Sequence, residues 1–409
     1  MNISFFIAKR LFSTKENNNN YTRTIISIAV LAISLSVSLM MISLIILKGF
    51  KNEIYNKVTG FGSHIKITKL TDNQSFENYP INFDDQLYSE ILNNENVTNI
   101  QTVATKAGII KNNEEILGVV LKGVGNDYDH SFLKSNLIEG NTLLISEDSL
   151  KKSNDIVVSE SIARKIGCSV GDKLSIYFMD NPVRVRKLNV IGVYNTGLSE
   201  FDDLLVFGDI KQIQKLNNWN SSQIGAYEVS LKDLKFLQDE AEKIYQNLDF
   251  NLNTTTIKQS YPQIFDWLAL QDLNIIVIIT LMLIVGSVNM ITALLIIILE
   301  KTQFIGLLKS LGASNKIIRR VFLYNSLYLI SKGLFFGNLI ALGFAVLQEK
   351  FSFISLDPEI YFMDTVPVSI DFLPLLYLNI GTIIICYVFL IVPSFIVSKI
   401  SPVKALRFE

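Results

Sequence analysis

The sequence has few residues that form disulfides or bind metals. It contains two cysteines, Cys168 and Cys386, and two histidines, His64 and His130. The cysteines lie far apart and we expect a membrane boundary between them, which argues against a disulfide framework. Neither histidine has a second histidine or a cysteine at metal-ligand spacing. We therefore expect both to be surface or hydrogen-bonded residues, and we predict no metal site.

The sequence also lacks the motifs of common hydrolases. It has no G-x-x-x-x-G-K-[ST] phosphate loop, no H-E-x-x-H zinc motif and no G-x-S-x-G nucleophile motif. We therefore predict that the chain is not an enzyme and that it binds no cofactor. If ATP drives it, the ATPase is another polypeptide.

Charged residues are scarce. They make up 18% of the 409 residues, against 49% hydrophobic residues, and the mean hydropathy is +0.34. This composition is too apolar for an ordinary soluble protein of this length. The net charge of −1 gives no indication of a nucleic-acid partner.

Four segments are long and apolar enough to cross a bilayer, which takes about 20 apolar residues. They are 24–48, about 273–299, about 321–347 and about 372–397. The first is too long for the apolar part of a signal peptide and lacks a small-residue cleavage site after it, so we interpret it as an uncleaved anchor. We predict an α-helical membrane protein with four transmembrane helices and a large mixed α/β domain between helices one and two.

Lysine and arginine near the span ends predict the orientation. They lie before span one, between spans two and three, and after span four: Lys9, Arg10, Lys15, Arg23; Lys301, Lys309, Lys316, Arg319, Arg320; Lys399, Lys404, Arg407. The loop between spans three and four has only Lys350 against several carboxylates. Both termini are therefore expected in the cytoplasm.

Residues 49–265 are expected on the other side, as a folded extracytoplasmic domain. Strands are predicted in "SHIKITKL", "DKLSIYF", "RKLNVIGVY" and "DDLLVFG", and a hairpin in "GIIKNNEEILGVVLKGV" around Asn112–Asn113. A helix is predicted in "SESIARKIG", with Ser159 as N-cap and Gly167 as its stop. "LKDLKFLQDEAEKIYQNL" predicts a longer amphipathic helix. Residues 1–23 predict a cytoplasmic amphipathic segment on the membrane surface.

The segment "EKTQFIGLLKSLGAS" lies between spans two and three. We predict a short cytoplasmic helix over 300–312, with Phe304, Leu307, Leu308 and Leu311 on one face and Gly312 as its C-terminal stop. One interpretation is a helix that only rests in the membrane interface. The other is a helix that docks into a cytoplasmic partner and passes force to the spans.

At this point the chain resembles a known family. "FIGLLKSLGAS" is similar to the coupling segment of FtsX/MacB-type ABC transporter permeases, and the likeness is closest to the lipoprotein-releasing LolC/LolE permeases. Similar segments also occur in order elsewhere: "FIAKRLFS", "LKGFKNEIYNKVTGFGSHIKI", "DIVVSESIARKIGCSVGDKLSIY", "KLNVIGVYNTG", "MLIVGSVNMITALLIIILEKTQ" and "SKISPVKALRFE". Two features differ, because Gln303 stands where the family usually has Glu and the link "YFMDNPVRVRKLNV" is short where LolC-type subunits extend a chaperone-recruiting hook.

The resemblance implies a MacB-like periplasmic core over 49–265 and an FtsX-like permease domain over 266–409. It implies a transporter that works by mechanotransmission and releases lipoproteins from the inner membrane for transfer to the outer membrane. Partners would be a cytoplasmic ABC ATPase dimer that holds ATP and Mg, a second permease copy or paralogue, membrane lipid, lipoprotein cargo and a periplasmic lipoprotein chaperone. The alternatives are a MacB-like exporter permease, an FtsX-like signalling protein that activates cell-wall hydrolases, and a structural or sensor protein. The ATPase-coupling residues would be Phe304, Leu307, Leu308, Lys309, Leu311 and Gly312.

Further residues in or near the spans invite a role. Long apolar side chains that could hold acyl chains, or simply pack, are Met40, Met41, Leu44, Ile45, Phe265, Trp267 and Leu268. Small residues spaced by four predict close helix packing: Gly333, Gly337 and Ala341. Lys332 lies inside span three and is expected either to find an ion-pair partner or to line a polar path.

Overall fold

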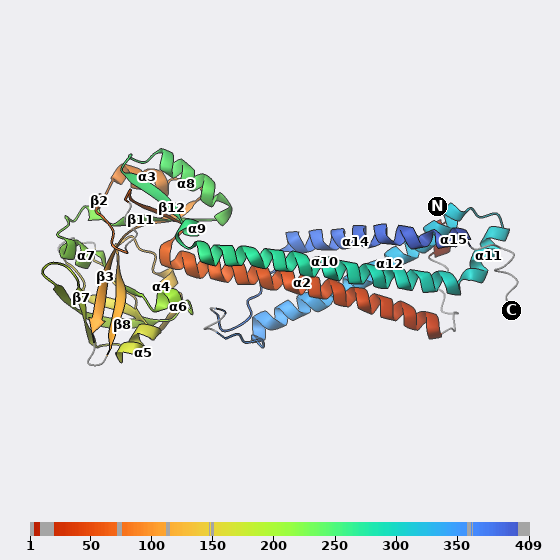
Figure 1. Ribbon diagram of the computed structural model, residues 1–409, viewed down its shortest axis with the longest axis horizontal. Coiled ribbons are helices and arrows are strands. Elements are labelled where there is room, and N and C mark those ends of the chain that lie inside the picture. The colour runs from red at the N-terminus through yellow and green to blue at the C-terminus, as the bar shows by residue number, and fades with distance from the viewer. Residues whose placement is uncertain are drawn as a thin grey trace. The chain divides into compact units, whose positions relative to one another are not determined.

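The computed structural model describes residues 4–8, 20–71, 76–111, 115–146, 148, 151–357, 361 and 363–399. The chain divides into two compact units (Figure 1). The helical unit comprises Met1–Asn52, Trp267–Ser355 and Thr365–Glu409, and the α/β unit comprises Glu53–Asp266 and Leu356–Asp364. The sequence did not predict that residues 356–364 group with the second unit.

Four helices in the described residues are long and apolar enough to cross a membrane, which confirms the predicted fold class. They are α2 (Asn20–Gly62), α10 (Pro262–Glu300), α12 (Asn315–Phe351) and α14 (Phe372–Ser394). The unit also contains two short helices, α11 (Thr302–Ser310) and α15 (Ile396–Lys399). Residues 4–8 are also helical, whereas 9–19 and 400–409 fall outside the described residues, so most of the predicted amphipathic N-terminal segment is not described.

Helix α2 continues well past the predicted end of span one at residue 48. The reason is the spacing of Ile54, Val58 and Phe61, which are buried at i, i+4 and i+7 with no proline between them. An apolar stripe at this spacing keeps the chain helical after the membrane-spanning stretch ends. The last turns of α2 therefore belong to the α/β unit, and Phe61 stacks there on Phe201 at 4.5 Å between ring centroids.

Helix α10 likewise begins earlier than predicted, at Pro262, a residue that suits the first position of a helix. Its turn to the next helix is made by Lys301. Helices α12 and α14 hold each other through a reciprocal amide pair, in which Asn338 Nδ2 lies 2.7 Å from Asn379 Oδ1 and Asn379 Nδ2 lies 3.0 Å from Asn338 Oδ1. Away from water such a satisfied pair fixes the register of the two helices.

The α/β unit is built on a ten-stranded sheet with the order β12-β1-β11-β3-β4-β9-β6-β8-β5, with β7 joined to β3 and β8. Its strands are β1 (Ile65–Lys69), β3 (Val97–Lys111), β4 (Ile116–Val124), β5 (Leu137–Gly140), β6 (Asp155–Ser159), β7 (Lys173–Phe178), β8 (Arg184–Tyr194), β9 (Leu205–Asp209), β11 (Ala226–Leu231) and β12 (Leu252–Thr256). Among the strands in the described residues, only β4–β9 and β6–β8 pair in parallel. A separate small sheet joins β2 (Ile81–Asn82) to β10 (Gln223–Ile224).

Helices cover this sheet and connect its strands. They are α3 (Asp85–Leu92), α4 (Ser131–Ser135), α5 (Glu160–Ile166), α6 (Ser199–Asp202), α7 (Ile210–Asn217), η1 (Leu234–Phe236), α8 (Leu237–Gln246) and α9 (Ile257–Ser260). The predicted caps of α5 are confirmed, because Ser159 Oγ accepts from Ile162 N and Gly167 adopts φ 68°. The predicted β3–β4 hairpin is confirmed by the pairing of Lys111 with Ile116, while its turn at 112–114 lies outside the described residues.

Candidate functional sites

Helix α11 carries the predicted coupling residues and ends where the sequence predicts. Gly312 adopts φ 86°, a conformation that glycine takes without a steric penalty. Its N–H donates to Lys309 O at 3.0 Å, and Ala313 N donates to Leu308 O at 2.9 Å. This pair of bonds closes the helix end as a Schellman motif, with Ala313 and Leu308 packed on the core of the helical unit.

The faces of α11 differ strongly in exposure. Leu307 and Leu311 are 50% and 76% exposed, whereas Ile305 is fully buried in the core of the helical unit. Phe304 and Leu308 lie at the boundary between the two faces. The helix is therefore apolar on two faces. One face packs against the core of the helical unit, and the other exposes Leu307 and Leu311 to solvent.

Lys309 points into the chain itself. Its ammonium donates to the carbonyl of Val397 at 2.9 Å and lies 3.4 Å from that of Ser398, so it holds α11 against α15. Arg319, at the start of α12, stacks on the Phe395 ring 3.5 Å from its centroid and donates to Ser394 Oγ at 3.3 Å. Lys309 thus connects α11 to α15, and Arg319 connects the start of α12 to the end of α14.

The residues considered for acyl contact are mostly packed inside. Met40, Met41 and Ile45 are at most 1% exposed and belong to the core of the helical unit, against which Leu44 also packs. Leu268 is fully buried as well. Trp267 packs edge-on against Phe50 at 5.4 Å. Phe265 belongs to the α/β unit, where its ring lies 5.4 Å from that of Tyr55.

The small-residue stripe of α12 faces α2. A Cβ on Gly333 would lie 2.4 Å from Ile33 Cγ2, and one on Gly337 would lie 2.8 Å from Val37 Cβ. Ala341 is fully buried. Larger residues at the two glycines have no room, so the stripe brings the backbones of α2 and α12 close together.

Lys332 is exposed on the surface of the helical unit. Its ammonium lies 4.5 Å from the centroid of the Tyr328 ring, one turn earlier on α12. A cation over an aromatic face is favourable, more so away from water. Lys332 therefore points outward, rather than into the packed interior between the helices.

A buried ion pair lies beneath the last turn of α2 in the α/β unit. Lys122 Nζ is 2.7 and 2.8 Å from the two carboxylate oxygens of Glu228, and it also donates to the carbonyl of Phe61. Gln101 Nε2 donates to the same carboxylate at 3.0 Å. Lys66 lies opposite Glu228 in the neighbouring strand, and burial lowers the pKa of Lys66. This network satisfies an orphan carbonyl at the C-terminus of α2.

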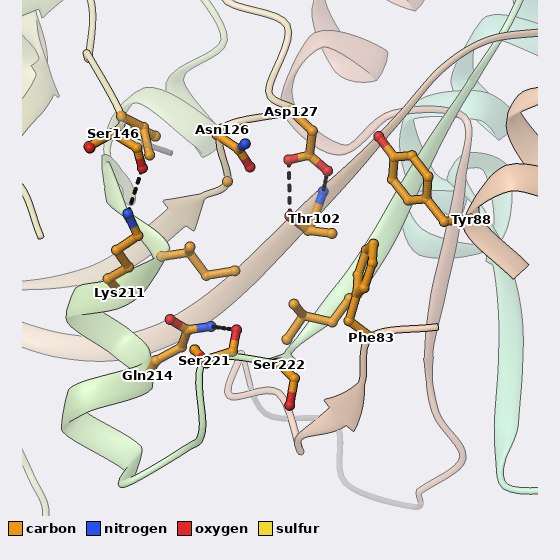
Figure 2. A pocket seen from close by; sticks show the side chains of 14 residues that line it. Phe83, Tyr88, Thr102, Asn126, Asp127, Ser146, Lys211, Gln214, Ser221 and Ser222 are labelled. Atoms are coloured by element: carbon orange, nitrogen blue, oxygen red, sulfur yellow. Dashed lines mark hydrogen bonds between the residues drawn. The ribbon is translucent and has the colours of Figure 1, made fainter. Parts of the chain in front are cut away.

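The α/β unit contains a cavity of about 400 Å³ that sequence reasoning missed (Figure 2). Asp127 lies in its wall, where its carboxylate accepts from Thr102 N at 2.8 Å and Thr102 Oγ1 at 2.9 Å, and burial raises its pKa. Lys211 donates to three loop carbonyls, those of Ser146, Asp148 and Lys151. An ammonium has three donors, so these polar groups brace the surrounding loops. The lining comes from segments far apart in the chain, which gave the sequence no signal.

The end of the β7–β8 hairpin in the α/β unit exposes apolar side chains. Strand β7 pairs antiparallel with β3 at Ile109 and Ile110, so this end points away from the tip of the β3–β4 hairpin, and Asp180 lies 3.0 Å from Lys106 of β3. We call its exposed residues the hairpin-tip surface: Met179, Val183 and Val185, which are 66%, 55% and 43% exposed. Exposed apolar clusters of this kind mark interaction sites more often than isolated apolar residues do.

No group of three or more metal-ligating side chains occurs among the described residues. Cys168 and Cys386 are both free. His64 Nδ1 accepts from Leu231 N at 3.2 Å, and burial lowers its pKa to about 4. Cys386 is buried and His64 is hydrogen-bonded to the backbone, so both side chains contribute to packing in this structure.

Comparison with known proteins gives two family matches and full-length relatives. The model of the MacB-like periplasmic core domain matches residues 27–243, and that of the FtsX-like permease C-terminal region matches 276–402. The lipoprotein-releasing system transmembrane protein LolC of Buchnera aphidicola subsp. Schizaphis graminum is 24% identical over 95% of each chain. The protein LolE of the same system in Haemophilus influenzae is 20% identical over 99% of each chain. The crystal structure of the periplasmic region of MacB from Actinobacillus actinomycetemcomitans aligns with a TM-score of 0.36 and 15% identity, over 51% of this chain and 95% of that chain.

Proposed function

Because this chain belongs to the family of proteins with a MacB-like periplasmic core domain and also carries an FtsX-like permease region, we propose that it is the membrane subunit of a lipoprotein-releasing ABC transporter. Full-length relatives named as LolC and LolE support the lipoprotein as cargo. Its ATPase is a separate chain that holds ATP and Mg. Both termini and α11 face the cytoplasm, and the α/β unit faces the periplasm.

One observation supports the coupling role of α11: the helix exposes two leucines on one face while its opposite face is buried. Leu307 and Leu311 form the surface that the ATPase grips, while Ile305 and the bonds from Lys309 to α15 connect α11 to the rest of the helical unit. A push on α11 is therefore passed to packed helices rather than absorbed by a free loop. Helices α2 and α10 each run without a break from the helical unit into the α/β unit, which provides a continuous route for that movement.

The acyl chains of the cargo are held between the outer parts of spans one and two. Met41 and Ile45 supply adaptable apolar contacts there, and each buried methylene contributes about 0.8 kcal/mol. Because both residues are at most 1% exposed in this structure, the helices must separate before acyl chains reach them. A second permease copy or a paralogue completes the cavity.

The hairpin-tip surface serves a soluble partner. Its three exposed apolar residues lie on the link that is short compared with a LolC-type hook, and they favour a periplasmic lipoprotein chaperone as the acceptor of the cargo. Replacing Met179 and Val183 by Glu is then expected to slow transfer to the chaperone without changing ATP hydrolysis.

The coupling role is tested with the double variant L307D/L311D. The two side chains are 50% and 76% exposed, and full burial of a leucine contributes about 2 kcal/mol, so their loss removes about 2.5 kcal/mol, or roughly 70-fold in affinity for the ATPase. The matched control is L144D, since Leu144 is 86% exposed in the α/β unit. Normal co-purification and transport by L307D/L311D would exclude the docking role of α11.

A further inference from the structure

The cavity of about 400 Å³ in the α/β unit combines aromatic rings with polar groups (Figure 2). The rings of Phe83 and Tyr88 line it, with their centroids 5.5 Å apart. Tyr88 donates its hydroxyl proton to the carbonyl of Ile100 at 3.0 Å, so its ring is fixed in place. Asn126 and Ser222 also line the cavity and are exposed, so a solute can enter it from the surrounding water.

Asp127 places a carboxylate in the wall of this cavity. It accepts from Thr102 N at 2.8 Å and from Thr102 Oγ1 at 2.9 Å, and it has no ion-pair partner in the described part of the chain. Gly125 makes room for it, because a Cβ there would lie 2.4 Å from Asp127 Oδ1. A carboxylate accepts about four hydrogen bonds, so its oxygens can take further donors from the cavity.

Lys211 is the other charged residue of the lining, and its donors are already used. Its ammonium donates to the carbonyls of Ser146, Asp148 and Lys151 at 2.6, 2.7 and 3.2 Å. An ammonium has three donors, so none remains for Asp127 or for a ligand. The cavity therefore carries a negative charge that its own lining does not neutralise, and an incoming cation would stabilise it.

We propose that this cavity binds an alkylammonium group, carried by a free small amine or by a lysine side chain of another polypeptide. The ammonium donates to the carboxylate of Asp127 and to the amide oxygen of Asn126. Its methylenes pack on the rings of Phe83 and Tyr88, whose faces attract a cation. A metal ion is a poorer fit, because it takes several oxygen ligands and the lining offers one carboxylate. The site does not depend on the transporter assignment, since its lining belongs to the α/β unit alone.

The site is tested by calorimetric titration of the full-length chain in detergent micelles. The probes are cadaverine, as a free amine, and lysine capped as its acetyl and methylamide derivative, as a side chain within a polypeptide. The matched neutral probe is norleucine with the same caps, which keeps the apolar chain and lacks the ammonium. We expect capped lysine or cadaverine to bind about 10-fold more tightly than capped norleucine, since hydrogen bonds to a charged group are lost in the neutral probe. Whichever amine binds more tightly identifies the source of the ammonium.

Variants of the same chain locate the binding. D127N should weaken amine binding about 10-fold, because the charge is lost while an oxygen remains to accept from Thr102 N. The control is D129N, which removes the same charge from an exposed residue outside the lining and should leave the affinity unchanged. Y88L should bind about 3-fold more weakly than Y88F, since both lack the hydroxyl and only Y88F keeps the ring.

Three results would overturn the site. They are equal affinity for capped lysine and capped norleucine, unchanged amine affinity in D127N, and no binding of either amine at millimolar concentration. Hydrogen exchange of the β3 and β4 amides shows whether each variant is folded. If D127N does not fold, the comparison of the charged and neutral probes on the unaltered chain still decides.

Discussion

The buried pair of Lys122 and Glu228 makes a sharp prediction about the α/β unit. Both side chains are only 3% exposed, and the ammonium lies 2.7 Å from the nearer carboxylate oxygen. Removing one partner of such a pair leaves an uncompensated buried charge and costs about 3–5 kcal/mol. The two partners differ, however, because Glu228 lies between two lysines, Lys122 and Lys66.

The order of the two single variants follows from that arrangement. In K122M the carboxylate keeps Lys66 and the amide of Gln101 as neighbours, so we expect a loss near 3 kcal/mol. In E228Q two ammonium groups remain without a counter-charge, so we expect a loss near 5 kcal/mol. The double variant K122M/E228Q should lose less than the sum of the two, since the members of one network are not independent.

The control is an ion pair with a similar N–O distance that is exposed to solvent. Lys165 Nζ lies 2.8 Å from Asp203 Oδ1, but the two side chains are 41% and 44% exposed. Exposed pairs contribute about 0–1 kcal/mol, so K165M should change stability little. Native-state hydrogen exchange of the β4 and β11 amides in the full-length chain measures these losses. Equal effects of K122M and K165M, or a larger loss in K122M than in E228Q, would refute the reasoning.

Three further predictions concern separate parts of the chain. Acidification from pH 6.5 towards pH 4 should destabilise the α/β unit, because burial lowers the pKa of His64 to about 4 and the unfolded state therefore binds a proton more readily than the folded state. The free energy of unfolding should fall by about 3 kcal/mol, as measured by hydrogen exchange, and by less in H64Q. G337L should lower the thermal unfolding midpoint, because overpacking costs about 1–3 kcal/mol and its Cβ would press on Val37, whereas G343L should not, because nothing lies within 4 Å of a Cβ at Gly343; equal midpoints would exclude close packing at the stripe. Membrane-impermeant thiol reagents should label N126C from the periplasm and S314C only after the membrane is opened; labelling of both from one side would exclude the proposed orientation.

The membrane spans were predictable because hydropathy is local. Each span is a continuous apolar segment of sufficient length. Helices α2, α10 and α12 contain the first three predicted segments, and α14 covers the fourth as far as Ser394. The continuation of α2 to Gly62 was missed, since the segment after residue 48 has a stripe of apolar residues rather than an apolar run. Strand order was beyond reach as well, because pairings such as β3 with β7 and β11 join segments far apart in the chain.

The candidate site was predictable only in part, for a related reason. Helix α11 has nine residues and apolar side chains on two faces, so periodicity alone could not tell which face is buried. The sequence pointed to Leu307 and Leu311, which are exposed, but gave no weight to Ile305, which is the residue in the core. Pairs such as Lys51 with Asp272 join residues on different helices, and the charges alone do not show that they meet.

The most direct test of the account measures whether the acyl chains of the cargo are what the chain recognises. Proteoliposomes containing the chain and its partner ATPase are loaded with a triacylated lipoprotein or with the same protein anchored by a transmembrane helix. The account predicts ATP-dependent release of the triacylated form alone, lost in L307D/L311D and retained in L144D. Release of neither form while ATP hydrolysis remains coupled to the chain would contradict it, and would favour an exporter or a signalling protein instead.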